Sequence, residues 1–218
     1  MTTVNNFIDK ISNEQTALLP AVEFRGEIRI VEHERDIAAA CKTLAEQPVI
    51  GFDTETRPSF RKGQIHKVAL MQISTADRCF LFRLNKIGIC AELKEFLENP
   101  DILKIGLSVH DDFNVLRRSG EINRQGFVEL QNMVHRYDIT DISLQKIYAI
   151  IFGERISKSQ RLTNWEAAEL SPAQQAYAAL DAWACLKIYN YLKDGRFDPL
   201  SSPYRRRPEP KPAARPLT

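Results

Sequence analysis

The stretch Val49-Ile50-Gly51-Phe52-Asp53-Thr54-Glu55 is apolar until it ends on two carboxylates with one residue between them. Such a run is typical of a buried strand, and side chains two positions apart in a strand point to the same face. Asp53 and Glu55 are therefore expected to project together from the end of a buried strand. Two carboxylates held that close repel each other and lose hydration, so a bound cation, a basic partner or a raised pKa must offset the cost. Because a lone Asp-x-Glu is more often a solvated strand exit, its meaning depends on the rest of the chain.

Further strands and helices are expected on both sides of this stretch. Residues 28–31 are typical of a short strand and residues 34–46 of an amphipathic helix. A polar loop at 56–67 then leads into strands at 68–74 and 78–84, which a turn at 75–77 joins as an antiparallel pair. The remaining expected elements are helices at 91–99, 111–118, 142–152 and 172–192, a strand at 102–109, and a strand in the first half of 127–134. This order predicts an α/β domain with a mixed sheet flanked by helices.

Two of these helices carry start signals. Asp141 is placed to cap the helix at 142–152. Ser171 and Gln174 have the spacing of a capping box, with Pro172 at the first helical position. Both helices are therefore expected to begin close to these residues.

Length and composition fit one globular domain. The chain has 218 residues, of which 44% are hydrophobic and 27% charged, enough for one α/β domain with a sizeable core. We expect an N-terminal arm or helix at 1–22, the domain at 23–195, and a Pro/Arg-rich disordered tail at 196–218. No apolar run approaches the roughly 20 residues of a membrane span, and residues 1–15 lack the layout of a signal peptide. We therefore expect no membrane contact and a cytoplasmic location.

Charge and cysteine usage narrow the chemistry of the body. The four cysteines are scattered through apolar segments, which predicts small core residues rather than zinc ligands or disulfides. The formal charge is +2, but residues 205–218 contribute +4, so the remainder of the chain carries −2. Any affinity of the body for a polyanion must then come from local groups or bound metal.

Acidic residues also interrupt two later apolar segments. Asp181 is the only charge between residues 176 and 186, in a helix apolar enough to be buried, and Tyr177 lies one turn earlier on the same face. A buried Asp that accepts a hydrogen bond from a tyrosine or a helix end is the alternative explanation. Asp112 stands in the first turn of its helix, where capping and the helix dipole also favour Asp. Asp111 and His110 share that position and leave the choice of carboxylate open.

Three separate segments thus end in, or are interrupted by, carboxylates. Ligand sets made only of oxygen suit Mg²⁺ or Mn²⁺, whereas zinc usually recruits His or Cys. Four carboxylates that converge from different elements would repel one another severely without cations. With two divalent ions about 4 Å apart they form a device for in-line phosphoryl displacement.

Three motifs that contain these carboxylates follow one another along the chain. They are Phe52-Asp53-Thr54-Glu55, Lys104-x-Gly106-x-Ser108 leading into Asp112-Phe113-x-x-Leu116, and Tyr177-Ala-Ala-Leu-Asp181-Ala. In this order and at these separations they resemble the three motifs of the DEDDy 3′-5′ exonucleases, with the Werner-type exonuclease domain nearer and ribonuclease D further off. The likeness extends from about residue 28 to 193. Leu180 and Trp183 depart from it, since relatives more often have Thr and Tyr there.

The resemblance implies a ribonuclease H-like fold in a single exonuclease domain, with two divalent cations, Mg²⁺ or Mn²⁺, as cofactors. It implies that Asp53, Glu55 and Asp181 hold the ion that activates water. Asp53 would bridge to the second ion, which Asp112 would bind largely through water. Tyr177 would orient the attacking water. The implied partner is nucleic acid with a free 3′ end, and the product is a 5′-nucleoside monophosphate; protein partners stay open.

Basic residues near these motifs are candidates for contact with the substrate backbone. Lys158 and Arg161 precede the Tyr177 helix, and Arg57 and Lys67 lie with Arg61 and Lys62 in the loop after the Asp53 strand. Solvated surface charge is the alternative for each of them. Trp165 is expected to pack its loop onto the body rather than stack on a base.

Rival functions follow from the same residues. A catalytically silent nucleic-acid-binding or scaffold module would lack a metal carboxylate, yet Asp53, Glu55, Asp112 and Asp181 are all present. A polymerase-bound proofreading subunit is a further alternative. The motifs do not separate DNA from RNA, which depends on contacts to the 2′-hydroxyl. Because ribonuclease D usually carries extra helical domains, we expect DNA somewhat ahead of ribonuclease D-like trimming of RNA 3′ ends.

Overall fold

A six-stranded mixed sheet forms the centre of the computed structural model, which describes residues 7–59 and 66–207. Its strands lie in the order β2 (Glu27–Val31), β5 (Arg78–Phe82), β4 (Val68–Ser74), β3 (Val49–Thr56), β6 (Leu103–Gly106) and β7 (Phe127–Glu129). β4 runs antiparallel to β3 and β5, while β6 is parallel to β3 and β7. The predicted mixed sheet and the antiparallel pair at 68–84 are confirmed. Arg61 and Lys62 lie outside the described residues.

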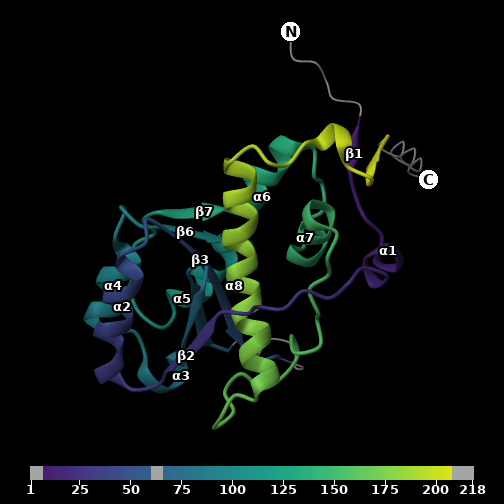
Figure 1. Ribbon diagram of the computed structural model, residues 1–218. Helices are drawn as coiled ribbons and strands as arrows, with labels where there is room; N and C mark the ends of the chain where they lie inside the picture. The colour runs from purple at the N-terminus through teal and green to yellow at the C-terminus, as the bar shows by residue number, and fades with distance from the viewer. Residues whose placement is uncertain (1–6, 60–65, 208–218) are drawn as a thin grey trace, which may run out of the picture.

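Helices cover both faces of this sheet (Figure 1). One face carries α8 (Pro172–Lys193), with α6 (Leu130–Val134) and α7 (Leu144–Phe152) beside it. The other face carries α2 (Ile37–Ala45), α4 (Ala91–Glu98) and α5 (Val109–Leu116). The remaining elements are short: β1 (Ile8–Asp9), α1 (Asn13–Ala17), α3 (Leu84–Ile87), β8 (Arg205–Arg206), and 3₁₀ turns at Glu34–Asp36, His135–Tyr137 and Pro199–Ser201.

Close contact between β3 and α8 fixes the centre of the fold. A Cβ built at Gly51 would lie 1.9 Å from the carbonyl oxygen of Ala182, so only glycine lets the helix backbone approach the strand this closely. The helix begins as predicted: Ser171 Oγ accepts from the backbone N–H of Gln174, and Gln174 Oε1 accepts from that of Ser171. The side chains that flank Gly51 and Ala182 are therefore held against each other.

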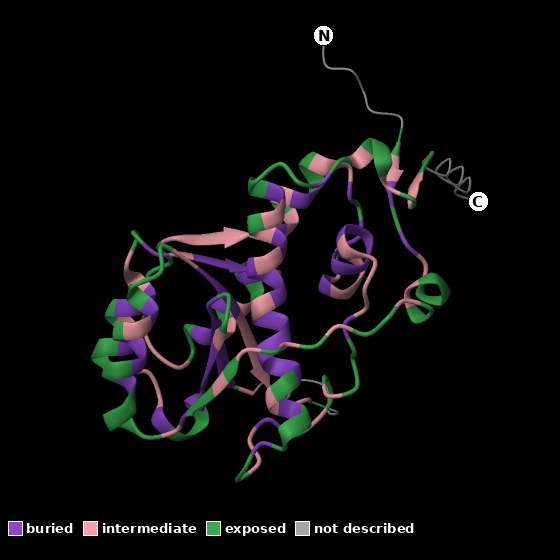
Figure 2. Ribbon diagram, viewed as in Figure 1, coloured by how far each residue is buried: buried purple, intermediate pink, exposed green. Residues whose placement is uncertain are grey.

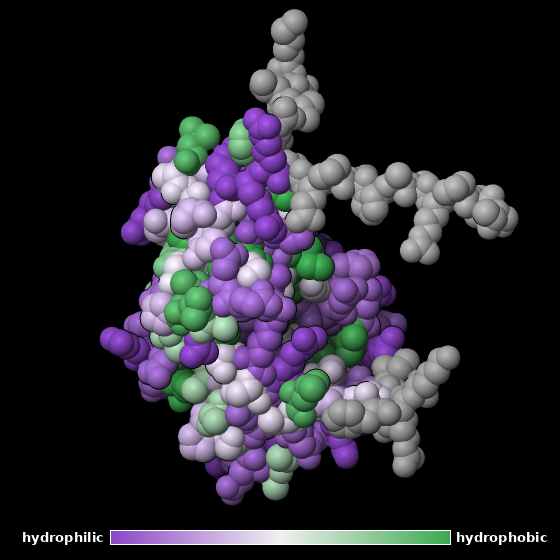
Figure 3. Space-filling model, turned by 90° about the vertical axis from the view of Figure 1, so that its right-hand side faces the viewer, coloured by the Kyte–Doolittle hydropathy of each residue, from purple (hydrophilic) through white to green (hydrophobic). Residues whose placement is uncertain are grey.

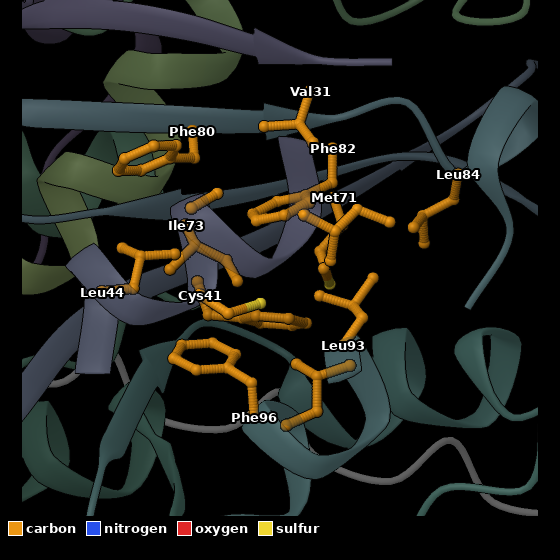
Figure 4. Close-up of a cluster of buried hydrophobic side chains, with 14 of the residues drawn as sticks. Val31, Cys41, Leu44, Met71, Ile73, Phe80, Phe82, Leu84, Leu93 and Phe96 are labelled. Atoms are coloured by element: carbon orange, nitrogen blue, oxygen red, sulfur yellow. The ribbon is translucent and has the colours of Figure 1, made fainter. Parts of the chain in front are cut away.

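Large apolar side chains fill the space between the sheet and α2 and α4 (Figure 4). Phe82 and Met71 from the sheet are fully buried there, as is Leu44 of α2. Figure 2 shows the resulting pattern, with buried residues concentrated on the inner strands of the sheet and on α8. Since one large buried side chain contributes about 1.5–3 kcal/mol, this core holds β3 rigidly in place.

Several element ends differ from the prediction by a few residues, and two of the differences have a clear structural cause. β6 ends at Gly106 rather than at 109, because Ser108 adopts a left-handed conformation (φ 60°) that turns the chain into α5. Asp141 does not cap its helix, which starts at Leu144 with Ser143 as N-cap. Instead, Asp141 Oδ2 accepts from the backbone N–H of Ile11 at 3.0 Å, so this carboxylate ties the N-terminal segment to the body.

Part of the predicted tail is ordered. Residues 196–218 were expected to be disordered, but Phe197 is buried and β8 pairs with β1 in a two-stranded antiparallel sheet. Arg205 adds an ion pair to Asp138 at 3.4 Å. The prediction is therefore wrong for this part, and residues 208–218 lie outside the described residues. The domain limits at residues 23 and 195 stay a prediction.

Figure 3 shows one face of the molecule. On the part of it that grey atoms leave visible, apolar side chains lie in separate small patches among polar ones. Within residues 7–59 and 66–207, no helix combines the length and the apolar character needed to cross a membrane.

Candidate metal centre

Three carboxylates meet where β3 contacts α8. Asp53 and Glu55 lie on the same face of β3 as Gly51, which is the face that α8 covers. Asp181 projects from α8 and is 5% exposed. One oxygen from each of the three carboxylates lies within 4.8 Å of the other two. The structure thus brings together three of the predicted metal ligands.

Asp112 joins these three carboxylates from the first turn of α5. We call Asp53, Glu55, Asp112 and Asp181 the acidic group. Asp112 Oδ1 accepts a hydrogen bond from Thr54 Oγ1 at 2.9 Å, so the residue between Asp53 and Glu55 holds it beside β3. Asp111 and His110 are exposed to solvent. Of the candidates left open in this turn, Asp112 is the one that faces the other carboxylates.

Burial raises the pKa of every carboxylate in the group, and repulsion from the other carboxylates of the group adds to the rise for Asp53 and Glu55. The pKa of Asp53 lies well above its usual range because of burial, with further contributions from Asp112, Asp181 and Glu55. Burial and the neighbouring carboxylates raise the pKa of Glu55 to about 8. Burial raises the pKa of Asp112 and of Asp181 to about 7, against hydrogen bonds from Thr54 and Tyr177 respectively. The group is poorly stabilised as charged carboxylates by the protein alone.

The donor set fits a divalent cation. Asp181 Oδ1 is buried and has no hydrogen-bond partner among the described residues. The converging ligand atoms are all carboxylate oxygens, which hard cations such as Mg²⁺ and Mn²⁺ prefer. A positive charge at this position would offset both the repulsion and the unmade hydrogen bond.

Tyr177 lies one helical turn before Asp181, and its nearby hydroxyl opposes the rise in the pKa of that carboxyl. Its ring packs against Trp165 with ring centroids 6.0 Å apart, and Trp165 is fully buried, so Trp165 packs its loop onto the body as predicted. Burial, with nearby carboxylates, raises the pKa of Tyr177 far above neutrality. The phenol is therefore a neutral donor fixed at the edge of the acidic group.

Glu129 supports Asp112, although it was not among the site residues predicted from the sequence. It ends β7, and its carboxylate accepts from the backbone N–H groups of Ser108 and Val109 at 3.0 and 2.8 Å, which start α5. It also accepts from the N–H of Gln131 at 3.1 Å. The sequence signal for Glu129 is a carboxylate at the end of the strand β7, which lies parallel to β6. The ends of parallel strands meet at one edge of a sheet, so a carboxylate there is expected near the start of α5.

Gln72 is a second residue near the carboxylates that was not predicted from the sequence. It is fully buried on β4 directly opposite Asp53, and both polar atoms of its side chain lack a partner among the described residues. A polar residue inside the otherwise apolar run at 68–73 was the signal. Its amide adds a further unpaired polar group beside the carboxylates.

Arg161 and Lys158, predicted to contact substrate, are exposed. Arg161 is close enough to the acidic group to oppose the rise in the pKa of Glu55. The structure places it at the border of the site, whereas for Lys158 it shows an exposed position on the same loop.

Arg57 and Lys67 lie on the two sides of the segment outside the described residues. Arg57 is exposed and forms an ion pair with Glu166 at 3.3 Å. Lys67 is exposed and, with Glu166, lines a cavity of about 550 Å³. Neither side chain belongs to the acidic group itself.

A mixed six-stranded sheet covered by helices, with carboxylates gathered at its central strand, defines a ribonuclease H-like nuclease domain. Solved structures share this fold: the Aedes aegypti Nibbler EXO domain matches with a TM-score of 0.71 at 22% identity, over 83% of this chain and 96% of that one. Escherichia coli RNase D matches with a TM-score of 0.70 at 22% identity, over 77% of this chain and 44% of that one.

The chain belongs to the 3′-5′ exonuclease family, whose model matches residues 28–195. It is 31% identical over 188 residues to the mouse bifunctional 3′-5′ exonuclease/ATP-dependent helicase WRN, across 80% of this chain and 13% of that protein. It is 27% identical over 203 residues to ribonuclease D of Acidiphilium cryptum, across 86% of this chain and 51% of that protein. The chain thus spans about half or less of the length of these relatives.

Proposed function

We propose that this protein is a metal-dependent 3′-5′ exonuclease that releases 5′-nucleoside monophosphates from nucleic-acid 3′ ends. The observation that carries the proposal is the convergence of Asp53, Glu55 and Asp181 within 4.8 Å, in a chain of the 3′-5′ exonuclease family. Divalent cations at such a site lower the pKa of bound water and neutralise charge on the leaving oxygen.

Each residue of the site has a distinct part in this proposal. Asp53, Glu55 and Asp181 would hold the first of two ions, Mg²⁺ or Mn²⁺. Asp53 and Asp112 would hold the second, with Thr54 fixing the Asp112 carboxylate through its hydrogen bond. Tyr177, a neutral donor beside Asp181, would orient the water that attacks the phosphodiester. Metal binding would require these carboxylates to be deprotonated.

The basic residues at the border of the site would position the substrate strand. Arg161 is the best supported, since its charge already acts on Glu55. The side chains of Lys158 and Lys67 are exposed and would reach phosphates farther along the nucleic-acid strand. Arg57 would do the same after exchanging its ion pair with Glu166 for one with a phosphate.

The substrate and compartment belong to the same proposal. We propose DNA as the first substrate to test and ribonuclease D-like trimming of RNA 3′ ends as the alternative. The relatives include both a WRN exonuclease/helicase and ribonuclease D proteins. All four cysteines are free thiols in the structure, which fits a reducing compartment such as the cytoplasm.

A time course on 5′-labelled oligonucleotides tests the proposal. Matched single-stranded and 3′-recessed DNA and RNA would be incubated with Mg²⁺, Mn²⁺ or EDTA, beside the variant Asp53→Ala. A metal-dependent ladder that shortens from the 3′ end, and that Asp53→Ala abolishes, is the expected result, and the faster polymer names the substrate class. Binding without cleavage of any substrate would contradict the proposal and favour a nucleic-acid-binding module.

A further inference from the structure

A groove beside α8, next to the turn between β4 and β5, has no part in the proposed catalysis. It has a volume of about 410 Å³, within the range of ligand sites. Its lining includes three aromatic side chains, two cations and an amide: Phe152, Trp183, Tyr191, Lys187, Arg196 and Asn190. No carboxylate is among the described residues that line it. We call this feature the outer groove.

The outer groove is separate from the acidic group although both involve α8. Trp183 follows Asp181 by two residues, which is about 200° around a helix. Asp181 faces β3, so Trp183 projects from the opposite side. Trp183 is also one of the two departures from the exonuclease motif, and the proposed function leaves its identity unexplained.

Lys187 is held at a fixed place in the outer groove. Its Nζ lies 4.3 Å from the ring centroid of Phe152 and 4.8 Å from that of Trp183, within the range of cation–π attraction. It also donates to the hydroxyl of Tyr148 at 2.6 Å and lies 3.7 Å from a carboxylate oxygen of Glu154. The ammonium group is thus preorganised among aromatic rings, with part of its surface open to the groove.

The other walls are similarly fixed. The indole N–H of Trp183 donates to the carbonyl oxygen of Ala76 at 3.1 Å. Arg196 is exposed, and its guanidinium carbon lies 4.6 Å from the ring centroid of Tyr191. Phe152 meets Tyr191 edge to face at 5.0 Å, so the ring under the guanidinium cannot turn freely. Stacked aromatic and guanidinium planes next to cations are the surface on which single-stranded nucleic acid binds.

We propose that the outer groove binds a nucleotide of a single-stranded nucleic acid, with the base against Trp183 or Tyr191 and the phosphates at Lys187 and Arg196. This inference rests on the proposed function, because it assigns the strand as the same substrate gripped at a second place. Charge complementarity supports the occupant. Arg196 and Lys187 line the groove, and although Lys187 lies 3.7 Å from Glu154, no carboxylate is among the described lining residues. The body outside residues 205–218 carries −2 and offers little general attraction to a polyanion.

The two tryptophans of the chain provide a direct measurement. Trp165 packs against Tyr177 at the proposed catalytic site, so the emission is followed in Trp165→Phe, where a ligand-dependent change reports Trp183 in the outer groove. The full chain would be titrated in EDTA with a 12-nucleotide single strand, with 5′-AMP and with inorganic phosphate. We expect saturable quenching by the 12-mer and at least about tenfold weaker binding of 5′-AMP, because the mononucleotide lacks the neighbouring phosphates. Equal affinity for 5′-AMP, or no change in emission, would overturn the proposal.

A pair of charge reversals tests the residues. Arg196→Glu changes the groove, whereas Lys193→Glu makes the same change in net charge at an exposed position outside it. We expect the Kd for the 12-mer to rise about tenfold in Arg196→Glu and less than about threefold in the control. Equal effects would mean general electrostatics and would overturn the site. The titrations are done in EDTA, where no cleavage is expected, so their outcome does not depend on catalysis. Failure of the unmodified protein to cleave with Mg²⁺ or Mn²⁺ would refute the proposed function separately.

Discussion

Asp181 shows a conflict between stability and chemistry within one residue. It is 5% exposed in a helix whose neighbours are apolar, and burial raises its pKa to about 7. One of its oxygens has no partner in the described part of the chain. A residue that costs folding free energy in this way is explained by what it binds rather than by what it packs against.

Replacing Asp181 by Asn should therefore separate the two effects. Asp181→Asn keeps the shape and the acceptor for Tyr177 but removes the charge, so we expect the free energy of unfolding in EDTA at pH 8 to rise by about 1–3 kcal/mol. Cleavage should fall by about 100-fold or more, because a metal ligand is lost. Urea unfolding and the oligonucleotide assay measure the two quantities. A variant that cleaves normally would refute the assignment.

Tyr177→Phe addresses the role of the phenol. Without the hydroxyl nothing orients the attacking water, so kcat should fall by about 10–100-fold, as for loss of one positioned donor. Affinity for Mn²⁺, followed by calorimetry, should stay within a factor of about three, since a phenol is not among the proposed ligands. An unchanged kcat would remove Tyr177 from the mechanism, and a large loss of Mn²⁺ affinity would make it a structural support of Asp181.

At the scale of elements, the start of α5 decides where Asp112 points. Glu129 from β7 satisfies the backbone N–H groups of Ser108 and Val109, which the helix itself cannot pair. Ser108, in its left-handed conformation, supplies no side-chain cap. The position of one proposed ligand thus depends on a carboxylate in another strand.

Glu129→Ala should consequently affect both stability and metal binding. Loss of the shared acceptor should lower the free energy of unfolding by about 1–3 kcal/mol. Mn²⁺ affinity should drop by about 10–100-fold, as when a residue that orients a ligand is lost. Glu121→Ala, an exposed site before β7, is the control. If both variants bind Mn²⁺ equally well, Glu129 does not position Asp112.

Lys104 makes β6 sensitive to pH. It is fully buried, its Nζ donates to the carbonyl oxygens of Asn99 and Gln125, and burial lowers its pKa to about 8. Between pH 8 and about 10.5 the unfolded chain then holds a proton that the folded chain has lost, so Lys104 makes stability increase with pH in that window. We expect the wild type to gain about 2–3 kcal/mol over Lys104→Met across this range in urea unfolding. A constant difference would show that Lys104 keeps its ordinary pKa.

Local patterns predicted the elements well, and contacts across the chain account for the errors. The capping box at Ser171 and Gln174 is correct because its partners lie three residues apart. Asp141 had an equally good local position, yet the backbone of Ile11, 130 residues away, took its carboxylate. Glu129 was missed for the same reason, since its main partners precede it by about 20 residues.

At the scale of the whole molecule, spacing alone could indicate that Asp53 and Glu55 share a face and that Asp181 is buried. It could not show that Gly51 lets α8 approach β3 closely enough for the three to meet. The ordered structure of residues 197–206 could not be predicted for a similar reason. Proline and arginine content is a local property, whereas the pairing of β8 with β1 joins opposite ends of the chain.

Metal binding should therefore stabilise the whole fold, since β3 and α8 are held together at the acidic group. A ligand that binds the folded state alone stabilises it by mass action, by about 2.7 kcal/mol at a hundred times its Kd. For a chain of this size each kcal/mol corresponds to about 2–4 °C, so Mn²⁺ or Mg²⁺ should raise Tm by several degrees over EDTA in differential scanning fluorimetry. Asp53→Asn, which removes the proposed bridging ligand and its repulsion, should melt higher than the wild type in EDTA and lose most of the response to metal. An equal rise of Tm in both proteins would place the ion elsewhere.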